Sequence, residues 1–136
     1  MSRYCIDTSA YSHFKLGDPR IVDMLDRADW IGVSSIVLGE LWTGFLQGER
    51  ALQNEAEFRE FLANPVVETL GMDGEVARIY AEIVTDLRRA GTPIPTNDIW
   101  IAAAAARAGA TVLTYDLHFR SVPRVGCLIL PIPGGN

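Results

Sequence analysis

The sequence predicts an α/β fold, a single domain in which a five-stranded parallel sheet is flanked by helices. Short apolar runs rich in β-forming residues alternate with helical patterns along the chain. The last two of these runs are continuously apolar, as in strands that are covered on both faces. The length of 136 residues, of which 49% are hydrophobic, suits one domain with its own core and leaves no room for a second.

The first half of the chain alternates strand and helix patterns. Ser34 or Ser35 is expected to cap a helix that ends near Gly48, and residues 49–63 are expected to form a surface helix. The other expected elements are a strand at RYCID (residues 3–7), a helix from near Ala10, a helix that starts at Asp18 and Pro19, and strands at WIGV (residues 30–33) and VVETL (residues 66–70).

The second half carries the clearest helical periodicity. Residues 74–91 place apolar side chains at helical intervals and predict an amphipathic helix. A proline-bounded loop over residues 92–97 precedes a helix over residues 98–109, which is apolar nearly all round and is expected to be buried on most sides. The last two strands are expected at TVLTY (residues 111–115) and CLILPI (residues 127–132).

The composition restricts the compartment and the partners. A formal net charge of −5 argues against binding of nucleic acid by bulk charge alone, so that any such contact must be local. Cys5 and Cys127 lie in expected strands without the spacing of a metal site, and we expect buried thiols in a reducing compartment. No apolar stretch has the length of a signal peptide or a membrane span, so we expect a cytoplasmic protein.

Four carboxylates occupy unusual places in this pattern. Asp7 and Asp116 each follow an expected strand, and Asp98 opens the expected alanine-rich helix. Open parallel sheets bind ligands at the carboxyl ends of their strands, so we expect these three aspartates to converge there. Each of them alone is more readily explained as a helix N-cap, but the three together favour a site. Glu40 lies on the apolar stripe of its helix, where a carboxylate is costly unless it is paired or bound to a cation.

A divalent cation is the simplest way to neutralise these acids. Lys15 is the only lysine of the chain, and the arginines lie mostly on charged helix faces. Oxygen ligands without a Cys or His cluster favour Mg²⁺ or Mn²⁺ over Zn²⁺. Such a site supports phosphoryl chemistry, in which the metal lowers the pKa of the attacking water and offsets the charge of the phosphate.

The motifs around these acids resemble one known family. They are IDTSAY at the start, SSIVLGELWTG around Glu40, and NDIWIAAAAARAGATVLTYDLHF, which contains Asp98 and Asp116. Together they resemble the PIN domain over residues 1–136, specifically the VapC-like toxins of bacterial toxin–antitoxin pairs. The resemblance implies a metal-dependent endoribonuclease acting on tRNA or rRNA, with Asp7, Glu40, Asp98 and Asp116 around Mg²⁺ or Mn²⁺. It also implies a homodimer and a cognate antitoxin that blocks the site.

Several side chains near the acids receive supporting roles. Thr114 matches a family position that often carries a hydroxyl near the metal, although an ordinary strand-end threonine explains it equally well. Thr8 and Ser9 can form hydrogen bonds to the acids. For His118 we expect a packed or capping histidine rather than a general base.

An apolar patch lies at the end of the Glu40 helix and consists of Trp42, Phe45 and Leu46. These side chains either belong to the core or form part of the groove that receives the antitoxin. In the second case, an apolar antitoxin segment would contact them, and an antitoxin Arg or Lys would point at the carboxylates.

Three other functions compete with the nuclease. A phosphoacceptor signalling domain is also an α/β unit of similar length, but its chemistry needs an acidic pair after the first strand and a lysine near the last. Asp7 has no acidic neighbour and Lys15 is in the wrong place; an aspartate-based phosphatase would need a second acid where Ser9 stands. A catalytically idle PIN-fold binding module is disfavoured because all four acids are present.

Overall fold

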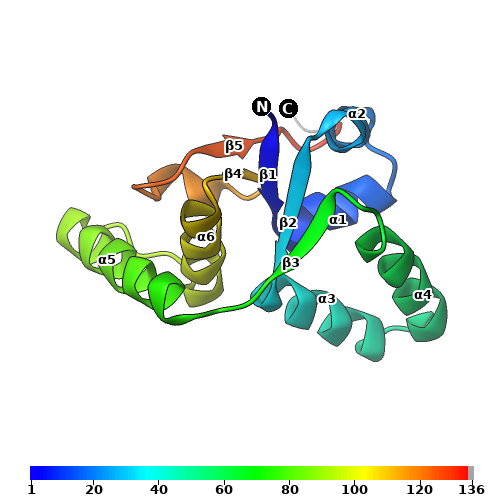
Figure 1. Cartoon of the computed structure of the whole chain (residues 1–136), viewed down its shortest axis with the longest axis horizontal. Helices are drawn as coiled ribbons and strands as arrows, with labels where there is room; N and C mark the ends of the chain where they lie inside the picture. Colours follow the sequence, from blue (N-terminus) through cyan, green and yellow to red (C-terminus); the bar gives the residue numbers. More distant parts are fainter. Residues whose placement is uncertain (135–136) are drawn as a thin grey trace.

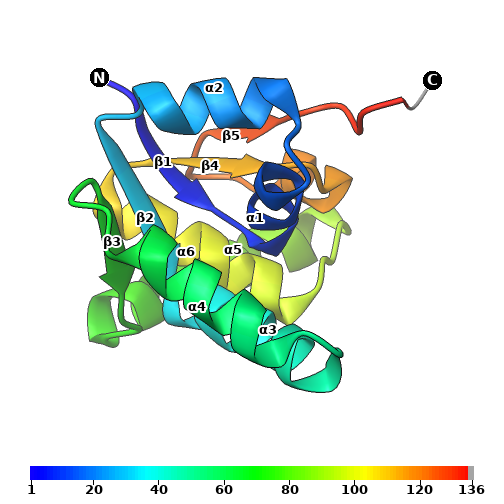
Figure 2. The same ribbon diagram turned by 90° about the vertical axis from the view of Figure 1, so that its right-hand side faces the viewer.

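Five parallel strands form one sheet between two layers of helices in the computed structural model, which describes residues 1–134 (Figures 1 and 2). The strands are β1 (Arg3–Ile6), β2 (Trp30–Ser34), β3 (Val67–Leu70), β4 (Thr111–Thr114) and β5 (Cys127–Ile129). The helices are α1 (Thr8–Lys15), α2 (Pro19–Arg27), α3 (Ser35–Gln47), α4 (Ala51–Leu62), α5 (Gly74–Ala90), α6 (Thr96–Ala108) and the 3₁₀ helix η1 (Leu117–Ser121).

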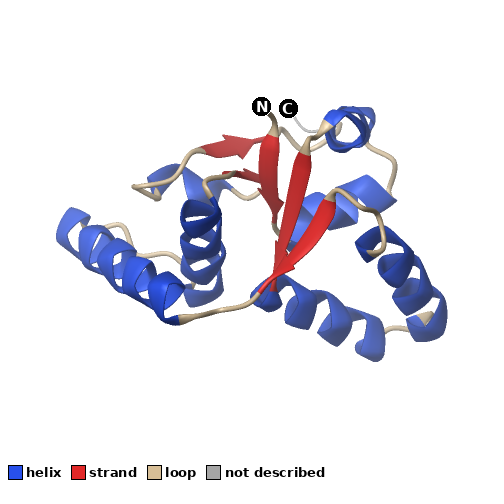
Figure 3. Cartoon of the chain, viewed as in Figure 1, coloured by secondary structure: helices blue, strands red, loops and turns tan. Residues whose placement is uncertain are grey.

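The strand order is β3-β2-β1-β4-β5, and every neighbouring pair is parallel (Figure 3). The predicted five-stranded parallel sheet is therefore confirmed. Strand β1 is central, so the carboxyl ends of β2, β1 and β4 meet at one edge of the sheet. This edge collects residues that lie far apart in the sequence.

Helices cover both faces of the sheet. Figures 1 and 2 show α5 and α6 on one face and α1, α2 and α4 on the other, with α3 running away from the carboxyl edge. Helix α6 lies between α5 and the sheet, and Ile101 and residues 102–105 are buried. The expectation that this nearly all-apolar helix is buried on most sides is thus confirmed.

Two helices begin earlier than expected. Helix α1 begins at Thr8 rather than near Ala10, because the Asp7 side chain caps it by accepting a hydrogen bond from the Ala10 N–H. Helix α6 begins at Thr96, so the expected loop is two residues shorter. Asn97 and Asp98 are consequently part of the first turn of the helix.

Strand β5 differs most from its expected form. It covers Cys127–Ile129 only and lies at the edge of the sheet, where Leu128 is 40% exposed. The expectation of a last strand covered on both faces is wrong here, because no residue of β5 is fully buried: Cys127 and Ile129 are half-buried and Leu128 is exposed. The Cys5 thiol is buried as expected, whereas Cys127 is only half-buried. Within residues 1–134, no helix combines the length and apolar character needed to cross a membrane.

The central sheet contains one position where only glycine fits. The ring of Trp30 extends over Gly32, two residues further along β2, and the Arg3 guanidinium lies 4.3 Å from the ring centroid. A Cβ atom on Gly32 would lie 2.5 Å from the Trp30 ring and 2.9 Å from the Cys5 sulfur. The ring can therefore lie against the strand only because residue 32 has no side chain.

We predict that Gly32→Ala lowers the free energy of unfolding by about 1–3 kcal/mol, because the Trp30 ring and the Cys5 side chain must move. Gly44→Ala is the matched control, since a Cβ there meets nothing within 4 Å and lies in a helix. The control should be more stable by up to about 1 kcal/mol. Urea unfolding of both variants tests this, and a Gly32→Ala variant as stable as the parent would contradict the packing described.

Candidate active site

Asp7 lies at the carboxyl end of β1 and is almost completely buried, with 4% of its surface exposed. One carboxylate oxygen accepts hydrogen bonds from the Ala10 N–H at 2.9 Å and the Ser9 hydroxyl at 2.8 Å; the other accepts one from the Thr114 hydroxyl at 2.5 Å. Burial raises the pKa of Asp7, and these three hydrogen bonds oppose the rise. Asp7 is therefore an N-cap, as the alternative interpretation held, and it also faces the other acids.

Asp116 follows β4 in the corresponding way. It caps η1, because its Oδ1 accepts a hydrogen bond from the His118 N–H at 2.9 Å. Its own N–H donates to the Thr114 hydroxyl oxygen at 2.9 Å, and the same hydroxyl donates to Asp7. Thr114 is fully buried and links the two aspartates, which is more than an ordinary strand-end threonine would do.

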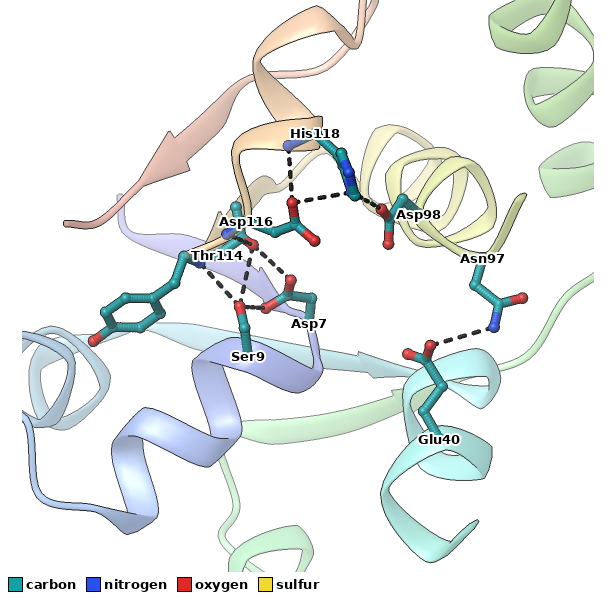
Figure 4. A network of polar contacts seen from close by, with 9 residues as sticks. Asp7, Ser9, Glu40, Asn97, Asp98, Thr114, Asp116 and His118 are labelled. Carbon is teal, nitrogen blue, oxygen red and sulfur yellow. Dashed lines mark hydrogen bonds and ion pairs between the residues drawn. The ribbon is translucent and has the colours of Figure 1, made fainter. Parts of the chain in front are cut away.

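Ser9 provides a second link between the two strand ends. Its hydroxyl oxygen accepts a hydrogen bond from the Tyr115 N–H at 2.9 Å while the hydroxyl donates to Asp7. The Tyr115 hydroxyl in turn donates to the carboxylate of Asp18 at the start of α2. Ser9 thus holds the chain after β4 against the start of α1 (Figure 4).

Asp98 reaches the same place from the first turn of α6. The helix begins two residues before it, and the N-cap position is Pro95, so the N-cap interpretation is wrong for Asp98. Its side chain is 15% exposed. Burial, then the charges of Asp116 and Asp7, raise its pKa to about 6, although the contact with His118 opposes this. The carboxylate is free of any capping role.

His118 joins Asp98 to Asp116. Its Nδ1 lies 3.2 Å from Oδ2 of Asp98 and 3.1 Å from Oδ1 of Asp116 (Figure 4). The side chain is 52% exposed. The expectation of a packed or capping histidine is therefore wrong, because it is the backbone N–H, rather than the ring, that takes part in the cap of η1. The spacing Asp-x-His after a strand was the only signal for this contact in the sequence.

Glu40 lies beside the three aspartates without touching them. Its Oε1 accepts a hydrogen bond from the Thr8 hydroxyl at 2.7 Å, and its Oε2 accepts one from the Asn97 side chain at 3.2 Å. The expectation that Glu40 faces the core is wrong, since Val37 and Leu41 fill the core and Glu40 is half-buried at its rim. Asn97 was missed because the sequence placed it in a loop.

The donor set fits a divalent cation. Asp98, Asp116 and His118 each offer one ligand atom, and these atoms lie within 4.8 Å of one another. In residues 1–134 no Lys or Arg forms an ion pair with Asp7, Glu40, Asp98 or Asp116. Carboxylate oxygens held this close without a basic partner favour an ion such as Mg²⁺ or Mn²⁺. A nitrogen of His118 thus lies among the possible ligands, beside the predicted carboxylates of Asp98 and Asp116.

The apolar patch lies apart from this cluster, towards the other end of α3. Leu46 is 70% exposed, Trp42 is 37% exposed and Phe45 is half-buried. Phe45 lines a groove between α1, α3 and α4, and both aromatic rings contact Phe58 edge-on. Phe45 therefore belongs partly to the core, whereas Leu46 is open to solvent.

Comparison with known proteins shows what this chain is similar to. Residues 4–125 match the PIN domain family. The chain is 36% identical to ribonuclease VapC4 of Mycobacterium tuberculosis over 71% of this chain and 74% of that protein. Among solved structures, it is similar to VapBC2 from Rickettsia felis, which was crystallised bound to a DNA fragment from the VapBC2 promoter. The TM-score is 0.81 and the identity 27%, and the match covers 94% of this chain and 98% of that one.

A second solved structure agrees with the first. VapBC-5 from Mycobacterium tuberculosis, a member of the VapBC family of toxin–antitoxin systems, has a TM-score of 0.74 and 26% identity, over 97% of this chain and 100% of that one. The family match covers most of the chain, and the architecture extends over the full length of both neighbours. The chain therefore belongs to the PIN domain family, as a relative of the VapC ribonucleases.

Proposed function

We propose that this chain is a metal-dependent endoribonuclease, the toxin of a toxin–antitoxin pair, and that it hydrolyses phosphodiester bonds in tRNA or rRNA. The observation that carries the proposal is the convergence of Asp7, Asp98 and Asp116 without a paired Lys or Arg in the described residues. The relatives support it, because VapC4 is named a ribonuclease and VapBC-5 is described as a toxin–antitoxin member.

The side chains divide into ligands and residues that orient them. Asp7, Asp98 and Asp116 would hold the cation, and Glu40 would complete the set from the rim. The chemistry that a bound Mg²⁺ or Mn²⁺ would supply there is a lower pKa for the attacking water and an offset of the charge on the RNA phosphate. Three hydroxyls orient the acids: those of Thr114 and Ser9 hold Asp7, and that of Thr8 holds Glu40 together with the Asn97 amide.

The boundaries and the assembly are part of the proposal. We take residues 1–136 as one domain, because β5 follows the matched residues 4–125 yet pairs with β4 in the same sheet. The homodimer rests on the resemblance to VapC-like toxins. The apolar patch at Trp42, Phe45 and Leu46 is the proposed part of the antitoxin groove.

The signalling domain and the idle binding module fit this geometry less well. A phosphoacceptor domain needs a lysine at the acidic site, but the Lys15 ammonium pairs with Glu57 on α4 at 2.9 Å. An idle binding module has no use for Asp98, because a carboxyl whose pKa is raised to about 6 by burial and by neighbouring acids weakens the fold. In a metal-dependent nuclease this carboxylate would serve as a ligand.

Asp7→Asn and Asp116→Asn should each lower RNA cleavage by on the order of 10²-fold or more with the fold retained, because an amide cannot balance the charge of a cation. The assay uses labelled RNA with Mg²⁺, Mn²⁺ or chelator. We expect products with 5′-phosphate and 3′-hydroxyl ends, from hydrolysis by water. Sequencing the new 5′ ends after induced expression identifies the RNA that is cleaved.

The matched control for these substitutions is Asp73→Asn. Asp73 also caps a helix, α5, and lies beside Arg3 and Arg107 away from the acidic cluster, so cleavage should be unchanged. Products with 2′,3′-cyclic phosphate would show that the ribose hydroxyl is the nucleophile. Undiminished cleavage in both site variants would exclude the carboxylates from the reaction.

Asp98→Asn should stabilise the metal-free protein near neutral pH. The pKa of Asp98 is about 6 in the folded state against 3.8 for the free group, so the folded state binds more protons between these values. Stability contributed by this carboxyl therefore falls as the pH rises from 3.8 to about 6, and the full penalty is present above that range. Thermal melts in chelator should show a Tm higher by a few degrees near neutral pH and little change at about pH 4.

Added metal should remove the higher Tm of Asp98→Asn relative to the parent. The stabilisation of the parent should grow with the logarithm of Mg²⁺ or Mn²⁺ concentration above the dissociation constant, and that of Asp98→Asn should be smaller. Asp73→Asn, which exchanges one capping side chain for another, should follow the parent in both series. A lower Tm for Asp98→Asn in chelator, with an unchanged metal response, would mean that Asp98 has only a structural role.

Trp42→Ala should weaken binding of the co-expressed antitoxin by about 2 kcal/mol, roughly thirtyfold, because large aromatic side chains dominate protein interfaces. Leu46→Ala should weaken it less. Leu128→Ala, which removes an exposed leucine from the edge strand β5, is the matched control and should have no effect. Titration calorimetry measures all three, and equal affinities for Trp42→Ala and Leu128→Ala would place the antitoxin elsewhere.

A further inference from the structure

Within residues 1–134, His118 offers the one nitrogen atom in the group of possible metal ligands formed with Asp98 and Asp116. Its ring is about half exposed to solvent, and its direction is set by the contacts of Nδ1 with two carboxylates. The backbone N–H bonds to Oδ1 of Asp116, and Nδ1 points between the carboxylates of Asp98 and Asp116 (Figure 4). The imidazole therefore approaches the same point as the two acids.

The spacing of these atoms is that of ligands around one ion. Adjacent ligands of an octahedral ion with bonds of about 2.1 Å are separated by roughly 3 Å, and opposite ligands by roughly 4–5 Å when longer bonds are included. Nδ1 lies 3.1 Å and 3.2 Å from the two carboxylate oxygens, and all three atoms lie within 4.8 Å of one another. One ion can contact all three with small movements of an exposed side chain.

A nitrogen ligand changes which ion the site prefers. Mg²⁺ takes oxygen ligands and gives up water reluctantly, whereas imidazole suits first-row transition metals. We propose that His118 binds the ion through Nδ1 and thereby makes the site select Mn²⁺ and similar transition metal ions over Mg²⁺. This inference rests on the proposed metal-dependent function, which left the choice between Mg²⁺ and Mn²⁺ open.

The competing role for His118 is that of a hydrogen-bond donor that neutralises the acids when no metal is bound. The two roles predict opposite effects of removing the ring. If the histidine occupies the place of the cation, its loss tightens metal binding, since the cation no longer has a competitor. If the histidine is a ligand, its loss weakens the binding of Mn²⁺ and leaves that of Mg²⁺ much less changed.

Mn²⁺ itself is the probe, because its unpaired electrons report a directly bound nitrogen in pulsed electron paramagnetic resonance. The chain has two histidines, so the control is the other one. His13 contacts the Ser9 carbonyl and stacks on Tyr115. It is not in the group of possible ligand atoms found in the described residues, and His13→Phe keeps a ring for this stacking. We expect nitrogen modulation of the Mn²⁺ signal in the parent and in His13→Phe, and its loss in His118→Ala.

The affinities provide a second readout. Calorimetry should show that His118→Ala lowers Mn²⁺ affinity by at least about tenfold, the loss typical of even an indirect metal contact, and Mg²⁺ affinity much less. His118→Asn, in which the new side chain is closer in size to histidine but lacks the imidazole, should show the same losses as His118→Ala. Thermal melts in chelator verify that both variants are folded.

Three results would overturn the inference in distinguishable ways. If Mn²⁺ binding depends on Asp116 but shows no nitrogen modulation, the carboxylates bind the ion and His118 is not a ligand. Tighter Mn²⁺ binding by both His118 variants assigns the histidine to the competing role. If the parent binds neither ion, and Asp116→Asn leaves RNA cleavage unchanged, there is no metal site and the proposed function is wrong as well.

Discussion

The hydrogen bonds of the buried Asp7 carboxylate are the interactions on which the acidic end of the molecule depends. It lies where the central strand passes into α1, and its oxygens accept hydrogen bonds from Ala10 in that helix, from Ser9 and from Thr114 on the neighbouring strand β4. Loss of the acceptor would leave buried donors without partners, which costs about 1–3 kcal/mol for each group. The start of α1, the end of β4 and the position of the acidic cluster are therefore set together.

Two of the acids have structural uses that are compatible with the proposed binding of a cation. Asp7 and Asp116 cap α1 and η1, and a carboxylate has enough lone pairs to accept these hydrogen bonds and still contact a cation. Asp98 has no capping use, and its pKa is the one raised to about 6 by burial and by the other acids. The fold thus keeps one carboxylate in an unfavourable position, which is typical of residues that are retained for function.

Much of the site could be predicted because its parts follow strand ends. The apolar run before Asp7 and the one before Asp116 are readable in the sequence, and parallel strands place such residues at one edge. His118 and Asn97 could not be found in this way. Their contacts depend on a 3₁₀ turn and on a helix that begins two residues early, both of which are local geometries that the sequence pattern places poorly.

The sequence by itself determined the fold class, the parallel sheet and the identity of the acids, because periodicity, capping residues and strand-end positions are local properties of the chain. Only the tertiary structure decided how these groups meet. Glu40 lies at the rim rather than in the core, held by Thr8 and Asn97, and His118 lies between two aspartates. Except for the contact of His118 with Asp116, two positions away, these contacts join residues 20 to 57 positions apart. Their distances follow from the packing of α3, α6 and η1 around the sheet edge, which no single segment specifies.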